Sequence, residues 1–310
     1  MRKAFRTVFL LLLALALPVC ALAEPVTEPR LPGPAVFDAS ETINVIERAT
    51  VSRSPLLDIA LSLLEEGNPF LARYNLATGA GIEPRLPFGV PYLYGGQTPS
   101  HVFAKAPDYV VQEAWLNSPS YFKKGTKYLY GFDCVGYVRW VWNTLGMGEW
   151  PGADGMLWDA GRHVYDTRTG LPDWETLARE LRPGDILVKR TPDNHVAFFL
   201  GTLRGFGYSA EDVPELAAYL DYPLVIHSST DAGVARRFDW LLKNSTLSKY
   251  RVASVTDGGV AVAILGVPKE EANSVFQQNQ TTWYFTLPDG SWLSVLTWEH
   301  ITQFCWRRAQ

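Results

Sequence analysis

The chain has 310 residues, of which 47% are hydrophobic and 19% are charged. This composition supplies enough apolar side chains to fill a core and excludes an intrinsically disordered chain, and the length allows one large domain or two ordinary ones. The formal net charge is −4, and no run of Lys and Arg follows residue 6. We therefore expect neither a nucleic-acid partner nor binding to an anionic membrane surface through basic patches.

The first 23 residues have the three-part pattern of a secretory signal peptide. Three basic residues within the first six precede the apolar run 8–17, and the small residues of 21–23 suit a signal peptidase. The run is too short for a stable membrane span, so we expect cleavage after Ala23 and a secreted, extracytoplasmic protein that is not inserted in a membrane. Two alternatives stay open: lipidation at Cys20 and retention of the run as an uncleaved anchor.

Residues 24–53 are rich in proline and polar residues and are expected to be a leader or linker, and 54–310 are expected to form a single domain. The first half of this domain has three predicted helices, each of which begins at a capping residue. They span 54–67, 133–146 and 173–181.

After residue 185 the apolar pattern changes to short β-branched runs bounded by turn residues. A Ser209–Asp212 capping box predicts a helix over 209–220 among them. Asp289–Gly290 between two further apolar runs predicts a C-terminal β-hairpin extension over 283–298. Helices followed by mostly antiparallel strands indicate the α+β class. The earlier predicted strands are 186–190, 195–201, 223–229, 250–255 and 260–266.

The candidate nucleophile is Cys134, which directly follows the predicted N-cap Asp133. Unpaired backbone N–H groups and the positive end of the helix dipole favour thiolate over thiol at this position. The same N–H groups could hold an oxyanion. The alternatives are a packed free thiol and a disulfide with Cys305, which we otherwise expect to be buried in terminal strand packing.

Two histidines supply a candidate base and its orienting partner. His195 begins a predicted strand and His227 lies in the next one, and neighbouring strands could place the two imidazoles side by side. His195 would then take the thiol proton of Cys134, and His227 would orient His195 through its second nitrogen. The alternative for each histidine is an ordinary core or surface residue.

Five short blocks follow one another along the chain: 91–96 (PYLYGG), 131–138 (GFDCVGYV), 182–188 (RPGDILV), 194–201 (NHVAFFLG) and 225–228 (VIHS). In type and order they resemble the blocks of the NlpC family, papain-like cysteine peptidases of the bacterial cell wall. The resemblance covers about 54–268. It implies a papain-like NlpC-type fold with the nucleophile at the N-terminus of a helix that packs on a mostly antiparallel sheet.

The resemblance also implies the roles of four residues. Cys134 would be the nucleophile, His195 the base and His227 the third, orienting residue. The family tyrosine that precedes the Gly-Gly pair corresponds to Tyr92, whose hydroxyl would lie near the oxyanion.

The family resemblance further implies a substrate. NlpC-type enzymes hydrolyse peptidoglycan stem peptides through an acyl-enzyme, typically at the γ-D-glutamyl bond to the diamino acid. The predicted export signal independently favours an extracytoplasmic, wall-associated location. Two other functions stay open: a thiol amidase that cuts the glycan–peptide amide, and a catalytically silent protein that binds the cell wall or acts as a scaffold.

The chain departs from the family pattern in three places. Val135 stands where the family usually has serine or a similar small residue. Two extra segments, 97–130 and 203–222, interrupt links between catalytic blocks. We therefore expect both segments to rim the active-site groove, as lids, specificity walls or packing.

No metal or cofactor is expected. His101, His163 and His300 have no partner at metal-ligand spacing, and no HExxH, CxxC, P-loop or dinucleotide fingerprint occurs. Nothing in the sequence indicates an oligomeric state.

Overall fold

The computed structural model divides the chain into two units, 1–33 and 34–310, and all described residues belong to the second. The predicted signal peptide, most of the predicted leader, nearly all of the 97–130 segment and the predicted strand 250–255 lie outside the described residues. Within the described part, no helix is long and apolar enough to cross a membrane. The structure describes residues 51–86, 89–96, 111–113, 127–129, 131–150, 152, 163–165, 173–190, 194–230, 258–279, 282–288, 292–298 and 303–308.

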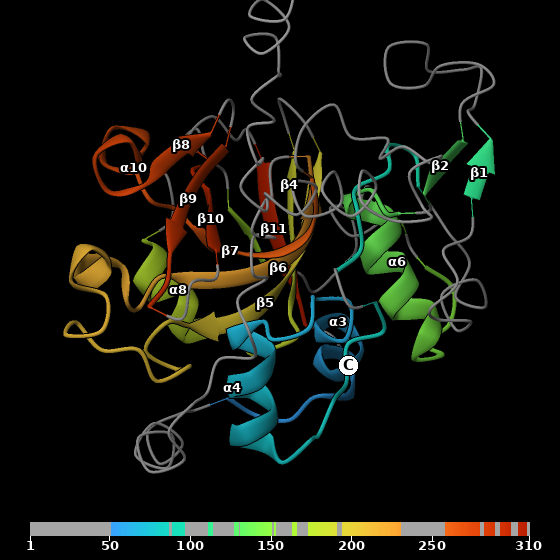
Figure 1. Ribbon diagram of the computed structural model, residues 1–310, viewed down its shortest axis with the longest axis horizontal. Helices are drawn as coiled ribbons and strands as arrows, with labels where there is room; N and C mark the ends of the chain where they lie inside the picture. Colours follow the sequence, from blue (N-terminus) through green and yellow to red (C-terminus); the bar gives the residue numbers. More distant parts are fainter. Residues whose placement is uncertain are drawn as a thin grey trace, which may run out of the picture. The chain divides into compact units, whose positions relative to one another are not determined.

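A nine-stranded sheet is the centre of the described fold, in the order β3-β11-β4-β5-β6-β7-β10-β9-β8 (Figure 1). Every neighbouring pair is antiparallel except β10 and β7, which are parallel. Two further strands, β1 (Val111–Glu113) and β2 (Lys127–Leu129), form a separate antiparallel pair. The predicted α+β class with a mostly antiparallel sheet is confirmed. The strands of the large sheet are β3 (His163–Tyr165), β4 (Ile186–Arg190), β5 (His195–Thr202), β6 (Pro223–Ser229), β7 (Gly259–Leu265), β8 (Gln277–Asn279), β9 (Thr282–Thr286), β10 (Trp292–Leu296) and β11 (Gln303–Arg307).

The helices agree with the sequence in part. The first predicted helix is shorter than expected, since α3 ends at Leu61 and a second helix, α4, begins at Pro69. Asn68 caps α4 by accepting from the Phe70 N–H, and Pro69 follows it, so the cap-then-proline signal was present but missed. The helices are α3 (Pro55–Leu61), α4 (Pro69–Thr78), α6 (Cys134–Thr144), α8 (Trp174–Glu180) and α10 (Lys269–Val275), with a 3₁₀ helix, η2 (Pro214–Tyr219).

The predicted helix 209–220 is wrong in type and extent. Ser209 and Asp212 do bond to each other, because the Asp212 carboxylate accepts from both the backbone N–H and the hydroxyl of Ser209. That pair closes a turn, and the helical residues begin only at Pro214, in 3₁₀ geometry. The local polar contacts therefore compete with the helix instead of starting it.

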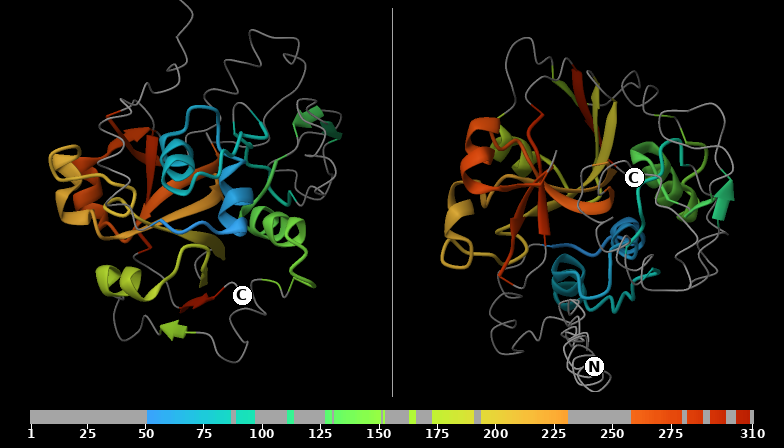
Figure 2. Two further views of the ribbon diagram at one scale, coloured as in Figure 1. Left: turned by 90° about the horizontal axis from the view of Figure 1, so that it is seen from below. Right: turned by 45° about the horizontal axis from the view of Figure 1, so that its top comes forward.

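The two faces of the central strands bury different partners (Figure 2). Phe198 and Ile226 pack in one apolar cluster with residues of α3 and α6. Phe199 and Val225 pack in a second cluster with Trp174 of α8. Because side chains alternate along a strand, the odd-numbered residues at the start of β5 and the end of β6 belong to the α8 face.

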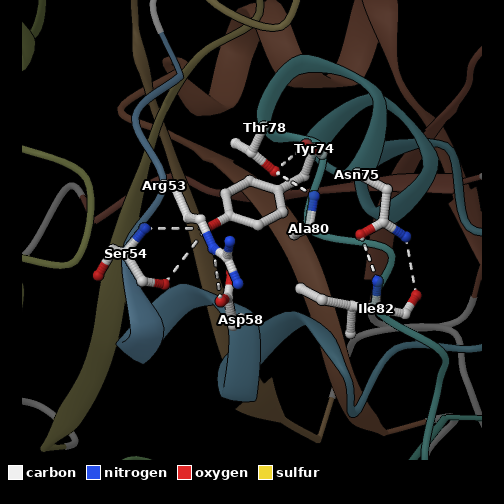
Figure 3. A network of polar contacts seen from close by, with 8 residues as sticks. All are labelled: Arg53, Ser54, Asp58, Tyr74, Asn75, Thr78, Ala80 and Ile82. Carbon is white, nitrogen blue, oxygen red and sulfur yellow. Dashed lines mark hydrogen bonds and ion pairs between the residues drawn. The ribbon is translucent and has the colours of Figure 1, made fainter.

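A polar network joins α3 to α4 (Figure 3). The hydroxyl of Tyr74 donates to the Asp58 carboxylate at 2.8 Å and accepts from the Ser54 N–H at 3.0 Å. Asn75 holds the chain after α4 through two bonds to the backbone of Ile82. The joined helices pack with α6 in one cluster, so they support the helix that begins with Cys134.

The predicted C-terminal hairpin is confirmed as the antiparallel pair β9–β10. It is part of the main sheet, because β10 pairs in parallel with β7. The chain then returns as β11, which lies between β3 and β4 on the other side of the central strands. Cys305 of β11 is buried, and both it and Cys134 are free thiols, which excludes a disulfide between them.

Candidate active site

Cys134 is the first residue of α6, directly after an N-cap. Asp133 has extended backbone geometry, and its carboxylate accepts from the Gly136 N–H at 2.6 Å, as the sequence predicted for a cap. Tyr137, which is fully buried, anchors the next turn by donating from its hydroxyl to the Ala60 carbonyl of α3. Cys134 therefore belongs to a helix, α6, whose buried face packs in the first apolar cluster and fixes the position of the thiol.

The turn 91–96 packs backbone against backbone on the start of α6. The Phe132 N–H donates to the Pro91 carbonyl at 3.1 Å, and the Asp133 N–H donates to the Gly96 carbonyl at 3.3 Å. A Cβ at Gly136 would overlap the Gly96 carbonyl oxygen, which explains why this close approach needs glycine. Two blocks that are far apart in sequence therefore form one unit around Cys134.

Tyr92 belongs to this unit. Its backbone forms a parallel bridge with Phe132, two residues before Cys134, and its N–H donates to the Gly258 carbonyl. The structure thus places Tyr92 beside the start of α6 with its side chain half-buried.

The strand register brings the two histidines together. Phe198 is the partner of Ile226, so the same register continued toward the start of β5 makes His195 and His227 diagonal neighbours on one face. Nε2 of His195 lies 2.8 Å from Nδ1 of His227, and the rings meet edge to face. The predicted juxtaposition of the imidazoles is therefore present.

The segment 203–222 connects the far ends of these strands, where Thr202 is the partner of Pro223. The expectation that it rims the active-site groove is wrong, because both histidines lie at the opposite ends of β5 and β6. Its Phe206 packs on Phe70 of α4 instead. The length of this connection therefore has no bearing on how the histidines meet.

The thiol lies at the split between β5 and β6. Cys134 Sγ is 3.8 Å from the carbonyl oxygen of Asn194, to which the thiol donates a hydrogen bond. The backbone N–H of Val196 also interacts with the sulfur and acts to lower the thiol pKa. The segment just before Cys134 is also bonded to β6, since the Phe132 carbonyl accepts a hydrogen bond from the Ser228 hydroxyl at 2.7 Å. The sulfur is thus in contact with backbone groups on both sides of His195.

The β5 backbone explains why these groups are open to the thiol. The Phe199 N–H donates to the Asp185 carbonyl, next to β4, so odd-numbered residues of β5 direct their backbone groups toward β4. Asn194 and Val196 therefore direct theirs toward the β6 side, where Cys134 meets them. No hydrogen bond joins the thiol directly to His195, although both residues are within the described part of the chain.

The Cys134 thiol and the imidazoles of His195 and His227 are all neutral near pH 7. Burial raises the pKa of the Cys134 thiol to about 11, and the negative charge of Asp133 adds to the rise. Burial, followed by the positive charges of His227 and Lys189, lowers the pKa of His195 well below its usual value. Burial alone lowers the pKa of His227 to about 3. The predicted preference for thiolate is therefore wrong for the resting site, because desolvation of the sulfur outweighs the helix dipole.

His227 uses only one of its ring nitrogens. Its side chain is 1% exposed, and Nε2 has no hydrogen-bond partner among the described residues. Two neighbours of the histidine pair, Lys189 and Trp298, were missed by the sequence analysis. Lys189 could have been found, since it is opposite His195 in the hairpin of predicted strands 186–190 and 195–201, whereas no local signal points to Trp298.

The described residues contain no group of three or more His, Cys, Asp or Glu side chains that could hold a metal ion. No protein-family model, no curated protein and no solved structure matches this chain.

Proposed function

We propose that this chain is an exported thiol peptidase that hydrolyses peptidoglycan stem peptides, at the γ-D-glutamyl bond to the diamino acid. Cys134 is the nucleophile, His195 the general base and His227 the residue that orients the base. One observation supports the chemistry above all: the thiol lies against both backbone neighbours of a histidine whose Nε2 is held by a second histidine at 2.8 Å.

The hydrogen bond between the histidines determines which nitrogen acts as the base. Since Nε2 of His195 is engaged by His227, Nδ1 is the nitrogen left for the thiol proton. For Nδ1 to accept, His195 must carry its hydrogen on Nε2 and donate it to Nδ1 of His227. His227 then has its own hydrogen on Nε2.

The neutral resting state favours proton transfer during attack over a preformed ion pair. As Sγ of Cys134 bonds to the scissile carbonyl carbon, the thiol proton passes to Nδ1 of His195. The imidazolium then gives this proton to the departing amine, which leaves a thioester. Water attacks the thioester with His195 again as base, releases the acid and restores the thiol.

The oxyanion of each tetrahedral intermediate would lie at the N-terminus of α6. The backbone N–H of Cys134 is at the positive end of this helix, where developing negative charge is stabilised. We propose the Tyr92 hydroxyl as a second donor, in keeping with the NlpC resemblance and with its position beside Phe132.

The substrate is supported by the sequence alone. The NlpC-like blocks indicate cell-wall peptides, and the predicted signal peptide would deliver the chain to them. A digest of purified peptidoglycan with the mature protein tests both, with Cys134→Ala as the inactive variant and Cys305→Ala as a matched cysteine control. Stem-peptide fragments from the wild type and Cys305→Ala, but not from Cys134→Ala, are expected by mass spectrometry.

The fragment masses separate the remaining functions. Free stem peptides with intact lactyl-terminated glycan would identify a thiol amidase. No fragments from any variant, across several wall chemistries, would overturn the proposal and leave a binding or scaffold role.

A further inference from the structure

Trp298 is a neighbour of the histidine pair that the NlpC resemblance does not reach. Its ring centroid lies 6.4 Å from that of His195, with the planes 81° apart. The centroid of the His195 ring also lies 5.0 Å from that of His227, again with the planes 81° apart. The candidate base is therefore in edge contact with two rings.

The backbone of Trp298 has an unusual conformation. Its φ of 48° makes it the single non-glycine residue with positive φ in the described part of the chain. A bulky side chain is disfavoured in this left-handed region, and glycine or asparagine would adopt it more easily. Such residues persist where the surrounding structure holds them, and they gather at functional sites.

The side chain of Trp298 has a reason to be kept in this conformation. It is 5% exposed and packs in the apolar cluster on the α8 face, together with Ala197 and Phe199 of β5. It follows β10, whose end is fixed by the Gly266 N–H donating to the Leu296 carbonyl. The ring thus covers β5 although its own strand lies beyond β6 and β7 in the sheet.

Lys189 connects the same ring to the electrostatics of the site. It is the cross-strand partner of His195, and its Nζ lies 6.0 Å from the centroid of the Trp298 ring. Among the described residues, the charged or titratable side chains next to His195 are therefore His227 on β6 and Lys189 on β4, while the thiol of Cys134 contacts the backbone on both sides of His195. Trp298 is an apolar side chain in contact with His195.

We propose that Trp298 is a positioning residue that holds the His195 imidazole against His227 and excludes water from the Nε2–Nδ1 hydrogen bond. The inference rests on the proposed function only in taking His195 as the base. It gives a residue of the C-terminal part of the chain, which lies beyond the NlpC-like blocks, a role in positioning the His195 imidazole.

The test uses a matched pair of tryptophans. Trp306 is 4% exposed and belongs to the same cluster, and its ring also faces a cation, with Cζ of Arg308 at 5.1 Å. Trp306 has no ring contact with His195 in the described structure. Trp298→Leu and Trp306→Leu therefore remove the same ring from the same apolar layer, and only the first uncovers the imidazole.

The primary readout is the pKa of His195, followed through its ring Cε1–H resonance and assigned with His195→Gln. We expect the midpoint to rise by about one pH unit or more in Trp298→Leu, because hydration favours the imidazolium. Trp306→Leu is expected to stay within about 0.3 units of the wild type. Trp298→Phe, which keeps an aromatic face, should recover most of the wild-type value.

Alkylation of Cys134 by iodoacetamide at pH 7 is the second readout and needs no substrate. A base that loses its fixed orientation should assist the thiol less, so the rate should fall about tenfold in Trp298→Leu and recover in Trp298→Phe. Equal midpoints and rates in the Trp298 and Trp306 leucine variants would overturn the proposal. If Trp298→Leu does not fold, Trp298→Phe and Trp306→Phe provide the same comparison, with a smaller shift confined to Trp298→Phe.

Failure of the proposed function has a different signature. A wild type that leaves peptidoglycan uncut, while its His195 pKa still responds to Trp298, would reject the substrate and retain the positioning role.

Discussion

Removing the hydrogen-bond acceptor of His227 tests the histidine pair most directly. His227→Leu fills a similar buried volume without a polar atom, and His227→Asn restores an oxygen that can accept from Nε2 of His195. In His227→Leu, the tautomer of His195 that keeps Nδ1 free to act as the base carries its hydrogen on Nε2, and this buried N–H no longer has an acceptor. This costs about 1–3 kcal/mol.

That cost translates into a rate. At about 1.4 kcal/mol for each factor of ten, alkylation of Cys134 assisted by His195 should slow about 5- to 150-fold in His227→Leu. His227→Asn should stay within about fivefold of the wild type, since its oxygen restores the hydrogen bond at little cost. The assay is the iodoacetamide rate constant between pH 5 and 9, measured in a Cys305→Ala background so that only one thiol is counted.

Stability should move differently from reactivity. Nε2 of His227 already has no partner among the described residues, and in His227→Leu the imidazole of His195 can carry its hydrogen on Nδ1 instead of Nε2. The free energy of unfolding at pH 7 is therefore expected to change by less than about 1 kcal/mol. A slow but stable His227→Leu variant would support the orienting role. A His227→Leu variant that reacts like the wild type at pH 7 would refute it, because the thiol would then react without the histidine pair.

Three further predictions concern the same site. Asp133→Asn keeps an N-cap acceptor but removes a negative charge, so the thiol pKa should fall below about 11 and alkylation at pH 7 should become faster; an unchanged pH–rate profile would contradict this. Gly136→Ala would push a methyl group into the Gly96 carbonyl, and we expect a loss of at least about 1–3 kcal/mol in urea unfolding; wild-type stability would show that the turn can shift freely. Because the folded pKa values of His195 and His227 lie below 6.5, the unfolded chain binds more protons, so stability should be lost as the pH falls from about 6.5 toward 3. Urea unfolding at pH 7 and 4.5 checks this slope, which should be smaller in His227→Leu.

Much of the sheet could be predicted because its strands have strong local signals. β4 to β7 are runs of β-branched and aromatic residues bounded by turn residues, and an Asp-Gly pair stands in the sequence between the segments that form β9 and β10. The parallel pairing of β10 with β7 and the insertion of β11 between β3 and β4 had no such signal. These contacts depend on residues far apart in sequence, whose partners no local pattern specifies.

The candidate site divides in the same way. The position of Cys134 after its cap follows from a local rule, and the juxtaposition of His195 and His227 was predicted on the assumption that their strands are neighbours. The structure shows both geometries. The thiol pKa was mispredicted because the helix dipole can be inferred from sequence, whereas the burial of the sulfur depends on how β5 and β6 pack around it. Trp298 was missed for the same reason.

The magnitudes explain why burial determines the state of the thiol. A helix N-terminus stabilises a nearby negative charge by about 0.3–1 kcal/mol at most exposed positions. The rise of the Cys134 pKa from 9.0 to about 11 corresponds to roughly 3 kcal/mol in favour of the neutral thiol. In the proposed mechanism, reactivity would therefore come from His195 as a proton acceptor and not from a standing thiolate. Oxidation acts mainly on the thiolate, so a neutral, half-buried thiol is protected from it. This protection would be useful to a protein that is proposed to work outside the cytoplasm.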